Sequence, residues 1–266
     1  MKIELGDKVA LVMASSKGIG FGVAKSLHIS GARVAINGRD SDVLARASLE
    51  LTKGEKDSNR VFSLVGDIGD PLFLKHFVTE STNFFDAPID ILVTNSGGPP
   101  AGETFSITPE QWSSAIDRNL LSVVNICKLV APKMREKGWG RIIHLTSMTA
   151  KEPDSGMVLS NVTRAGVAAY SKTLAKELAP HGITVNTILT GSCLTERLKS
   201  LVRKDIEGTS ETLDDAVVRI SRTIPVGFIP SPEEFAHTIL FLASQYSANL
   251  TGLAIPLDGG MSRSVF

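Results

Sequence analysis

The alternation of short apolar runs with longer amphipathic segments constrains the fold of this chain more than any other feature. The apolar runs are rich in β-branched residues and have the length of strands; they occupy residues 8–14, 32–38, 60–67, 89–96, 140–147, 183–191 and 253–260. Segments with helical periodicity separate them, at residues 18–30, 40–53, 71–84, 109–137 and 157–179, and another begins near residue 232. Apolar strands that alternate with helices are typical of a parallel sheet covered on both faces. The sequence therefore predicts an α/β fold of the Rossmann type, a doubly wound parallel sheet of about seven strands with helices on both faces.

The organisation of the chain predicts a single domain. Its 266 residues contain no internal repeat and no low-complexity linker, and a chain of this length can bury one sizeable core. We therefore expect residues 1–266 to form one dinucleotide-binding and catalytic domain. Residues 192–230 are the least regular region, charged and helical in pattern, and they follow the sixth predicted strand. Ligands bind beyond the carboxyl ends of strands in such sheets, so this region is expected to form a lid over a substrate.

Composition argues against several classes of partner. The 28 basic and 28 acidic residues cancel, so net charge gives no reason to expect nucleic acid or an anionic membrane as a partner. No stretch is long and apolar enough to cross a bilayer, and the N-terminal residues lack a signal-peptide pattern. The two cysteines, Cys127 and Cys193, have neither disulfide-framework nor metal-site spacing. We expect a cytoplasmic protein with reduced thiols and no bound metal.

A glycine-containing turn follows the first predicted strand and leads into the first predicted helix. Residues 14–22 read Ala-Ser-Ser-Lys-Gly-Ile-Gly-Phe-Gly. Glycines at such a place let the backbone approach a pyrophosphate, whose charge the helix N-terminus stabilises. The alternative is a plain tight turn without a ligand, because a glycine pattern alone is weak evidence. The position between a strand and a helix at the start of the chain favours the nucleotide site.

The end of the second predicted strand indicates which nucleotide binds. NAD sites usually place a carboxylate here for the ribose 2′-hydroxyl, whereas NADP sites place an arginine near the 2′-phosphate. Gly38 supplies no carboxylate, and Arg39 follows it. Arg39 and Lys17 of the glycine turn can both pair with a phosphate, which favours NADP(H) over NAD(H). The alternative is that both are solvated surface cations.

With these features the sequence resembles the short-chain dehydrogenase/reductase family over nearly its whole length, especially the members similar to ketoacyl-acyl-carrier-protein reductase. The resemblance implies that the cofactor contacts are Ala14, Ser15, Ser16, Lys17, Gly18, Ile19, Gly20, Arg39, Asp67, Ile68, Asn95, Ser96, Gly97, Arg164, Thr190, Gly191 and Thr195. Within this set Asp67 and Ile68 match the residues beside the adenine. Residues 190–195 match the segment that holds the nicotinamide carboxamide, with Thr190 replacing a proline. Ala14 stands where glycine is usual, and it strains the turn if its φ is positive.

The same resemblance locates the catalytic residues, and two of them are unusual. The family's asparagine on the long helix is matched by Asn119, and its serine after the fifth strand is matched by Ser147. The places of the family's tyrosine, and of the lysine one helical turn later, hold Ser160 and Arg164. Tyr170 does not replace the tyrosine, because it lies about ten residues and roughly 15 Å further along the same helix.

The two substitutions keep a polar site but remove its proton donor. A tyrosine beside a cation can give up a proton near neutral pH, whereas a serine hydroxyl donates a hydrogen bond and is a poor acid. Arg164 stays charged and shares a helix face with Ser160, so it can clamp a ribose or stabilise an oxyanion. It does not easily relay protons.

Few other residues are candidates for the missing acid. His144 precedes Ser147 by three residues on a strand, so it is expected to point away from that serine and to pack inside the sheet. Lys151, Glu152 and Asp154 lie in the loop that follows, although most loop charges are only solvated. Asn119 can hold a chain of water molecules, and Cys193 is expected to pack rather than react.

Two functions fit this pattern. The first is a divergent NADP(H)-dependent oxidoreductase that moves a hydride between nicotinamide and a small carbonyl or alcohol substrate, with the proton coming from water or a loop residue. The second is a nucleotide-binding pseudoenzyme that acts as a sensor or as a subunit of a mixed oligomer. The retained Asn119 and Ser147 favour the first, and the lost tyrosine favours the second. The resemblance to a family of enzymes decides for the first and also implies a homo-oligomer, a dimer or tetramer, formed through the helices at 109–137 and 157–179.

Overall fold

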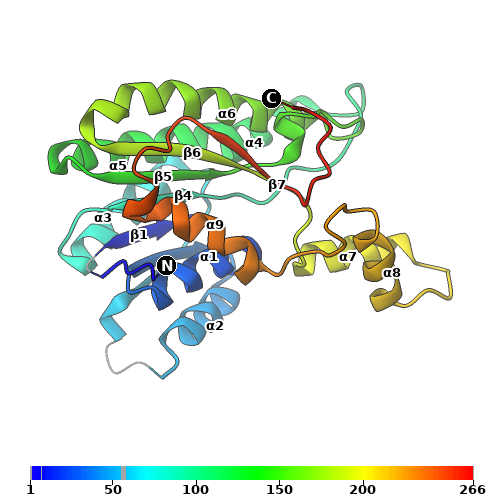
Figure 1. Cartoon of the computed structure of the whole chain (residues 1–266), viewed down its shortest axis with the longest axis horizontal. Helices are drawn as coiled ribbons and strands as arrows, with labels where there is room; N and C mark the ends of the chain where they lie inside the picture. Colours follow the sequence, from blue (N-terminus) through cyan, green and yellow to red (C-terminus); the bar gives the residue numbers. More distant parts are fainter. Residues whose placement is uncertain (1, 7, 55–57, 266) are drawn as a thin grey trace.

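A seven-stranded parallel sheet forms the centre of the molecule (Figure 1). The computed structural model describes residues 2–6, 8–54 and 58–265. The strands are β1 Val9–Val12, β2 Arg33–Gly38, β3 Val61–Val65, β4 Ile91–Thr94, β5 Gly140–Leu145, β6 Ile183–Thr190 and β7 Ala254–Leu257. Their order across the sheet is β3-β2-β1-β4-β5-β6-β7. The predicted doubly wound parallel sheet is confirmed.

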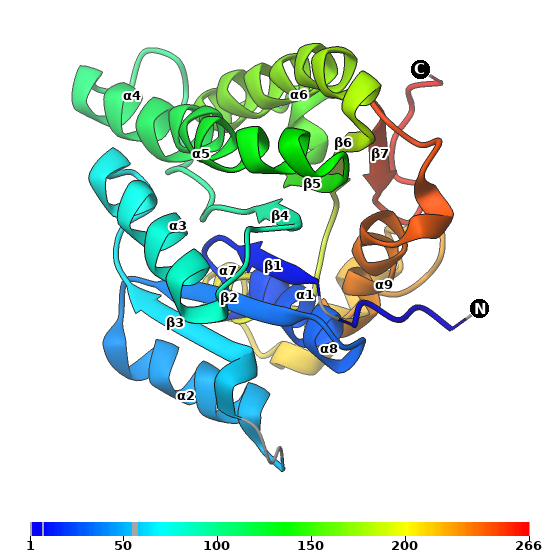
Figure 2. The ribbon, with the colours of Figure 1, turned by 90° about the vertical axis from the view of Figure 1, so that its left-hand side faces the viewer.

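Helices cover both faces of this sheet (Figure 2). One face carries α1 Gly18–Ile29, α2 Ser41–Thr52 and α9 Pro232–Ala243, and the other carries α3 Pro71–Phe85, α5 Ser122–Lys137 and α6 Val158–Leu178. Successive side chains of a strand point to opposite faces, so Ala10 and Val12 enter the first core and Val9 and Leu11 enter the second. Burial of both faces explains why β1 and most of β4 are continuously apolar instead of alternating.

The carboxyl ends of four strands meet at one edge of the sheet. Val12 at the end of β1 pairs in register with Val93 of β4. The residue after Val93 pairs with His144 of β5, and Leu145 at the end of β5 pairs with Ile188 of β6. The strand order reverses between β1 and β4, which is where ligands bind in open sheets of this kind. The turns after these strands carry most of the predicted site residues.

The prediction of one long helix over residues 109–137 is wrong in one respect. The segment contains α4 Pro109–Ile116, then a π-helical turn, η2 Asp117–Leu121, and then α5. A π-helical turn inserts one extra residue into a helix and is frequent at functional sites. Asn119 lies within η2, and only 2% of it is exposed. The irregular turn therefore carries the predicted catalytic asparagine into the protein.

Two helices occupy part of the region predicted as a lid. They are α7 Glu196–Asp205 and α8 Leu213–Ser221, and they project from one end of the molecule (Figure 1). Threonine hydroxyls cap both helices at their N-termini, Thr195 for α7 and Thr212 for α8. Closure of this segment over a substrate stays a prediction. The shorter helical turns are η1 Ser58–Arg60, η3 Met148–Ala150, η4 Ala179–His181 and η5 Gln245–Ser247.

None of the helices in the described ranges combines the length and the apolar character that a membrane span requires.

Candidate functional site

The glycine turn between β1 and α1 is closed by Asn37 near the end of β2. The Ala14 N–H donates to Asn37 Oδ1 over 2.8 Å, and the Ser15 N–H donates to the Asn37 carbonyl over 2.9 Å. The Ser15 hydroxyl is buried and donates to the Val12 carbonyl over 2.6 Å, so it braces the turn from inside. Ala14 has a φ of 47°, a left-handed conformation that strains a residue with a Cβ. The positive φ that was expected to strain the turn at Ala14 is therefore present.

Space around the turn is suited to a ligand. A Cβ added to Gly20 would lie 2.5 Å from the Ala14 carbonyl oxygen, so the turn and the helix approach as closely as glycine allows. A Cβ added to Gly97, after β4, would meet nothing within 4 Å. Lys17 is the N-cap residue of α1 and makes no side-chain capping bond in the described chain. The first N–H groups of α1 are therefore available to an anion, as a pyrophosphate requires.

The end of β2 excludes the carboxylate that an NAD site usually places there. A Cβ added to Gly38 would lie 2.6 Å from Ser16 Oγ, so no acidic residue fits at 38 without displacing Ser16. Arg39 and Lys17 are exposed beside it, and neither forms an ion pair within the described part of the chain. Asp40 caps α2 by accepting from two backbone N–H groups over 3.0 Å each, and these bonds lower the pKa of its carboxyl. The two cations predicted to meet a 2′-phosphate thus lie on one surface.

A network centred on Ser96 joins three predicted site residues at the carboxyl end of β4. Asn119 Nδ2 donates to Ser96 Oγ over 2.8 Å and to the Gly97 carbonyl over 2.9 Å. Arg164 Nη2 donates to the Ser96 carbonyl over 3.3 Å, and its Nη1 donates to the Leu145 carbonyl at the end of β5 over 3.2 Å. The guanidinium therefore bridges the ends of two neighbouring strands.

Arg164 is a buried cation. Only 5% of the residue is exposed, and its Nε has no partner in the described chain. Burial, and to a smaller extent the charge of Arg197, lower the pKa of Arg164 to about 10. The side chain therefore stays protonated at neutral pH and places a fixed positive charge at the site. Contact between this group and a ribose stays a prediction.

The two predicted catalytic serines are linked through a residue that lies between them. The Thr149 N–H donates to Ser147 Oγ over 3.2 Å, and Thr149 Oγ1 lies 3.0 Å from Ser160 Oγ. Ser147 is partly buried, and Ser160 is only 6% exposed. The position predicted to match the family's tyrosine thus holds a short, buried hydroxyl whose partner is another hydroxyl.

His144 packs inside the protein, as predicted. It is fully buried, its Nδ1 lies 2.8 Å from Thr94 Oγ1, and its ring centre lies 6.3 Å from that of Tyr170. Burial lowers the pKa of His144 to about 3, so the ring is neutral at physiological pH. Burial also raises the pKa of Tyr170, which makes this tyrosine a poor acid.

Glu152, one of the acid candidates of the loop after β5, is engaged by the C-terminal segment. Glu152 Oε1 accepts from the Ser262 hydroxyl and from the Arg263 and Ser264 N–H groups, each over 2.8 Å. The bond from Ser262 is the main cause of its lowered pKa. Asp154 is exposed, and its carbonyl accepts from the Asn161 side chain over 2.8 Å. Glu152 thus ties the C-terminal segment to this loop, and its carboxyl is not held in the protonated form.

The segment predicted to hold the nicotinamide follows β6. The Thr190 hydroxyl donates over 2.7 Å to a carbonyl of the loop after β5, and the Gly191 N–H donates to the Leu257 carbonyl over 2.9 Å. Thr195 caps α7, and its methyl carbon lies 3.4 Å from the position of a Cβ on Gly18. The start of the predicted lid therefore lies against the glycine turn.

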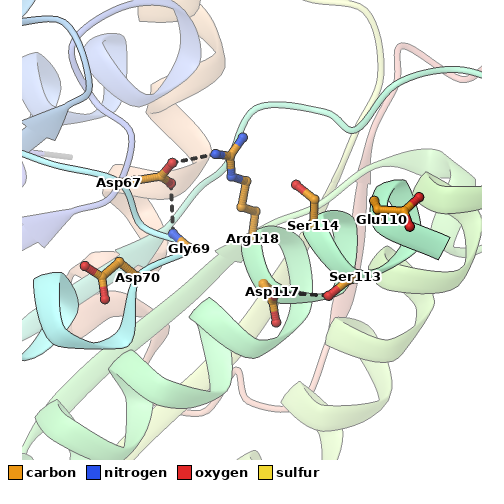
Figure 3. Close-up of a pocket in the computed structure, with 8 residues that line it drawn as sticks. All are labelled: Asp67, Gly69, Asp70, Glu110, Ser113, Ser114, Asp117 and Arg118. Carbon is orange, nitrogen blue, oxygen red and sulfur yellow. Dashed lines mark hydrogen bonds and ion pairs between the residues drawn. The ribbon is translucent and has the colours of Figure 1, made fainter. Parts of the chain in front are cut away.

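The predicted adenine contact lies in an open cavity of about 490 Å³ (Figure 3). Asp67 Oδ2 pairs with Arg118 Nη2 over 2.6 Å, and Asp67 Oδ1 accepts from the Gly69 N–H over 3.0 Å. Ile68 beside it is buried. Figure 3 shows Asp67 and Arg118 pointing toward one another, with Glu110, Ser113 and Ser114 of α4 beyond Arg118. The cavity is lined by Asp67, Gly69, Asp70, Glu110, Ser113, Ser114, Asp117 and Arg118.

The arrangement matches one known family. The family model described as Enoyl-(Acyl carrier protein) reductase matches residues 13–262. The chain belongs to the short-chain dehydrogenase/reductase family. The resemblance inferred from the motifs is confirmed, and the protein is an oxidoreductase of this family.

Individual relatives cover the whole chain. The 3-oxoacyl-(acyl-carrier-protein) reductase of Chlamydia muridarum is 31% identical over 98% of this chain and 100% of its own. The structure of L-sorbose reductase from Gluconobacter frateurii with NADPH and L-sorbose has a TM-score of 0.94 and 28% identity, covering 100% of both chains. An NADPH-bound short-chain oxidoreductase from Pseudomonas aeruginosa with an atypical catalytic centre has a TM-score of 0.89 and 30% identity, covering 98% of this chain and 99% of its own.

Sequence reasoning missed two residues that the structure brings to the site. Thr149 connects Ser147 to Ser160, and the only signal was a hydroxyl two residues after Ser147. Arg197 of α7 donates to the Gly98 carbonyl over 3.2 Å. No local pattern distinguishes this arginine from the other charges of the predicted lid.

Proposed function

We propose that the protein is an NADPH-dependent reductase of a small carbonyl substrate, and an alcohol dehydrogenase in the reverse direction. The observation that carries this proposal is the convergence of Asn119, Arg164 and the Ser147–Thr149–Ser160 hydroxyls around the carboxyl ends of β4 and β5. This arrangement keeps oxygen-orienting groups and a positive charge next to the point where the strand order reverses, between β1 and β4. Bound NADPH would supply the hydride.

The residues of the cofactor cleft fit NADPH better than NADH. The glycine turn and the open N-terminus of α1 suit a pyrophosphate, and Gly97 leaves room above the end of β4. Ser16 fills the space in which an acidic residue would face a 2′-hydroxyl, while Arg39 and Lys17 are free to meet a 2′-phosphate. The Gluconobacter and Pseudomonas relatives are described with NADPH, which supports the same choice.

The serines and the arginine have different tasks in this mechanism. Ser147 and Ser160 orient the substrate oxygen by hydrogen bonds, with Thr149 fixing both hydroxyls. Arg164 stabilises the negative charge that develops on that oxygen. The proton comes from water, because His144 is neutral and buried and Glu152 is held by the C-terminal segment. The atypical catalytic centre of the Pseudomonas relative is consistent with departures from the usual residues within this family.

A second candidate is a nucleotide-binding protein without turnover. The contacts of Ser160 and Arg164 favour it, because each already has a protein partner and neither is a useful acid. Both candidates require the same cofactor cleft, so only a measurement of catalytic turnover distinguishes them.

The test combines binding with single-turnover chemistry on the purified protein. Titration by cofactor fluorescence should show tighter binding of NADPH than of NADH, and Arg39→Ala should weaken only NADPH. Arg135→Ala, an exposed arginine of α5, is the matched control and should change neither affinity. Loss of NADPH absorbance with a panel of ketones, aldehydes and oxo acids should then reveal reduction. Tight NADPH binding with no reduced carbonyl would favour the binding protein, and equal affinities for both nucleotides would reject the assignment of Arg39.

We also expect a homo-oligomer in the cytoplasm. Leu121 of η2 and Val162 of α6 are 42% and 50% exposed, which supports packing of these helices against a second copy. Light scattering that shows only a monomer at micromolar concentration would contradict this expectation.

A further inference from the structure

Two arginines from different elements meet at the mouth of the proposed active site. Arg164 of α6 donates to the Ser96 carbonyl, and Arg197 of α7 donates to the Gly98 carbonyl over 3.2 Å. The two carbonyls are two residues apart in an irregular segment, and consecutive Cα atoms are about 3.8 Å apart, so they lie within roughly 8 Å of each other. Arg164 is buried beside the first of these carbonyls, and Arg197 is exposed beside the second.

Neither arginine has an acidic partner among the residues that the structure describes. Glu196 is adjacent to Arg197 in the sequence, but its carboxylate pairs with Lys199 over 2.9 Å and with Arg203 over 3.8 Å. Arg164 has a buried Nε without a hydrogen-bond partner. Two like charges placed close together repel one another, and an anion between them would remove this repulsion.

Gly98 makes the position of Arg197 possible. A Cβ on Gly98 would lie 2.7 Å from both terminal nitrogens of Arg197. The guanidinium therefore rests directly on the backbone, and any larger residue at 98 would push it away from the site. Among the described residues a single hydrogen bond holds the group there, which leaves most of its N–H donors for a ligand.

We propose that Arg197 and Arg164 together bind the carboxylate of an anionic substrate, an oxo acid or the corresponding hydroxy acid. The proposal rests on the proposed function and names the substrate class of the same site. The phosphates of the cofactor are matched elsewhere, the pyrophosphate by the N-terminus of α1 and the 2′-phosphate by Arg39 and Lys17. A carboxylate on Arg197 would leave the neighbouring carbonyl group of the substrate facing the serines, because the arginine fork matches a carboxylate in geometry.

The test uses malonate, a dicarboxylate that the enzyme does not reduce, and calorimetric titration of the NADP⁺-loaded protein. Malonate should bind and its dimethyl ester should not. Arg197→Gln should weaken malonate binding about tenfold or more, because charge-assisted hydrogen bonds are lost. The control is Arg203→Gln on the same helix, which should leave the affinity unchanged. NADPH affinity should be equal in all three proteins.

Three results would overturn the proposal: no malonate binding by the wild-type protein, equal binding of the ester, or unchanged malonate affinity in Arg197→Gln. Weaker NADPH binding with unchanged malonate binding would assign Arg197 to a cofactor phosphate instead. The measurement of malonate binding does not depend on catalytic turnover. Arginine-dependent malonate binding in a protein that reduces nothing would therefore reject the reductase and keep the anion site. Reduction of neutral carbonyls without malonate binding would keep the reductase and reject the anion site.

Discussion

The proton route can be tested through His144, because its burial has a measurable consequence for stability. The pKa of this histidine is about 3 in the folded protein, against an ordinary value of 6.5. Between these two pH values the histidine is protonated in the unfolded chain and neutral in the native protein. The free energy of unfolding therefore decreases as the pH falls below 6.5. Each pH unit in this window corresponds to about 1.4 kcal/mol. From pH 6.5 to pH 4.5 the histidine alone should remove roughly 2–3 kcal/mol from the free energy of unfolding.

Urea unfolding of the wild type and His144→Gln at several pH values measures this loss. Glutamine retains a group that can bond to the Thr94 hydroxyl but does not titrate, so the variant should lose less stability on acidification. His76→Gln is the control for loss of an exposed histidine, because the His76 side chain is 60% exposed, and the change in pH dependence in His144→Gln should exceed the change in this control. Parallel pH dependences for the wild type and His144→Gln would refute the assignment of a neutral, buried ring. Loss of carbonyl reduction in a stably folded His144→Gln would reinstate the histidine as a proton donor.

Three further changes test the turn, the serine–arginine pair and the C-terminal segment. Ala14→Gly should raise the free energy of unfolding by about 0.5–1 kcal/mol, because relief of left-handed strain exceeds the added freedom of the unfolded chain; denaturant titration checks this. Ser160→Tyr combined with Arg164→Lys should increase single-turnover carbonyl reduction by about 10²–10⁴-fold, and a folded, NADPH-binding variant without any gain would favour the binding protein. Glu152→Ala should speed hydrogen exchange at the amides of residues 263 and 264, and unchanged protection there would show that Glu152 does not hold this segment.

The sheet was predictable because both of its faces are buried. The strands therefore carry apolar residues on both faces, and these mainly apolar runs appear in the sequence without any knowledge of contacts. The expectation that Ser147 and Ser160 face one site rested on the resemblance, because their spacing along the chain matches that of the family's serine and tyrosine. The π-helical turn at Asn119 was not predictable, because its residues have no composition that separates it from the flanking α-helices.

The partners of the site residues depend on contacts that the sequence does not reveal. Arg164 meets a carbonyl 68 residues away, and Arg197 meets one 99 residues away. Thr149 was overlooked because its role depends on the direction of the loop after β5, which brings it between the two serines. A pattern of residue types identifies which positions face the site, whereas rotamers and long-range packing decide which of them bond to one another.

The predicted replacements of the family's tyrosine by Ser160 and of its lysine by Arg164 form one change in chemistry. A lysine at 164 would present a flexible point charge that can lower the pKa of a neighbouring phenol and reach a ribose. With serine at 160 there is no phenol to tune, and the planar fork of arginine instead spans two carbonyls at the ends of β4 and β5. The positive charge thereby becomes a fixed part of the sheet edge. Under the proposed function, cofactor affinity therefore rests more on Arg39, Lys17 and the glycine turn, and catalysis rests on a stationary charge beside the substrate oxygen and a proton from solvent.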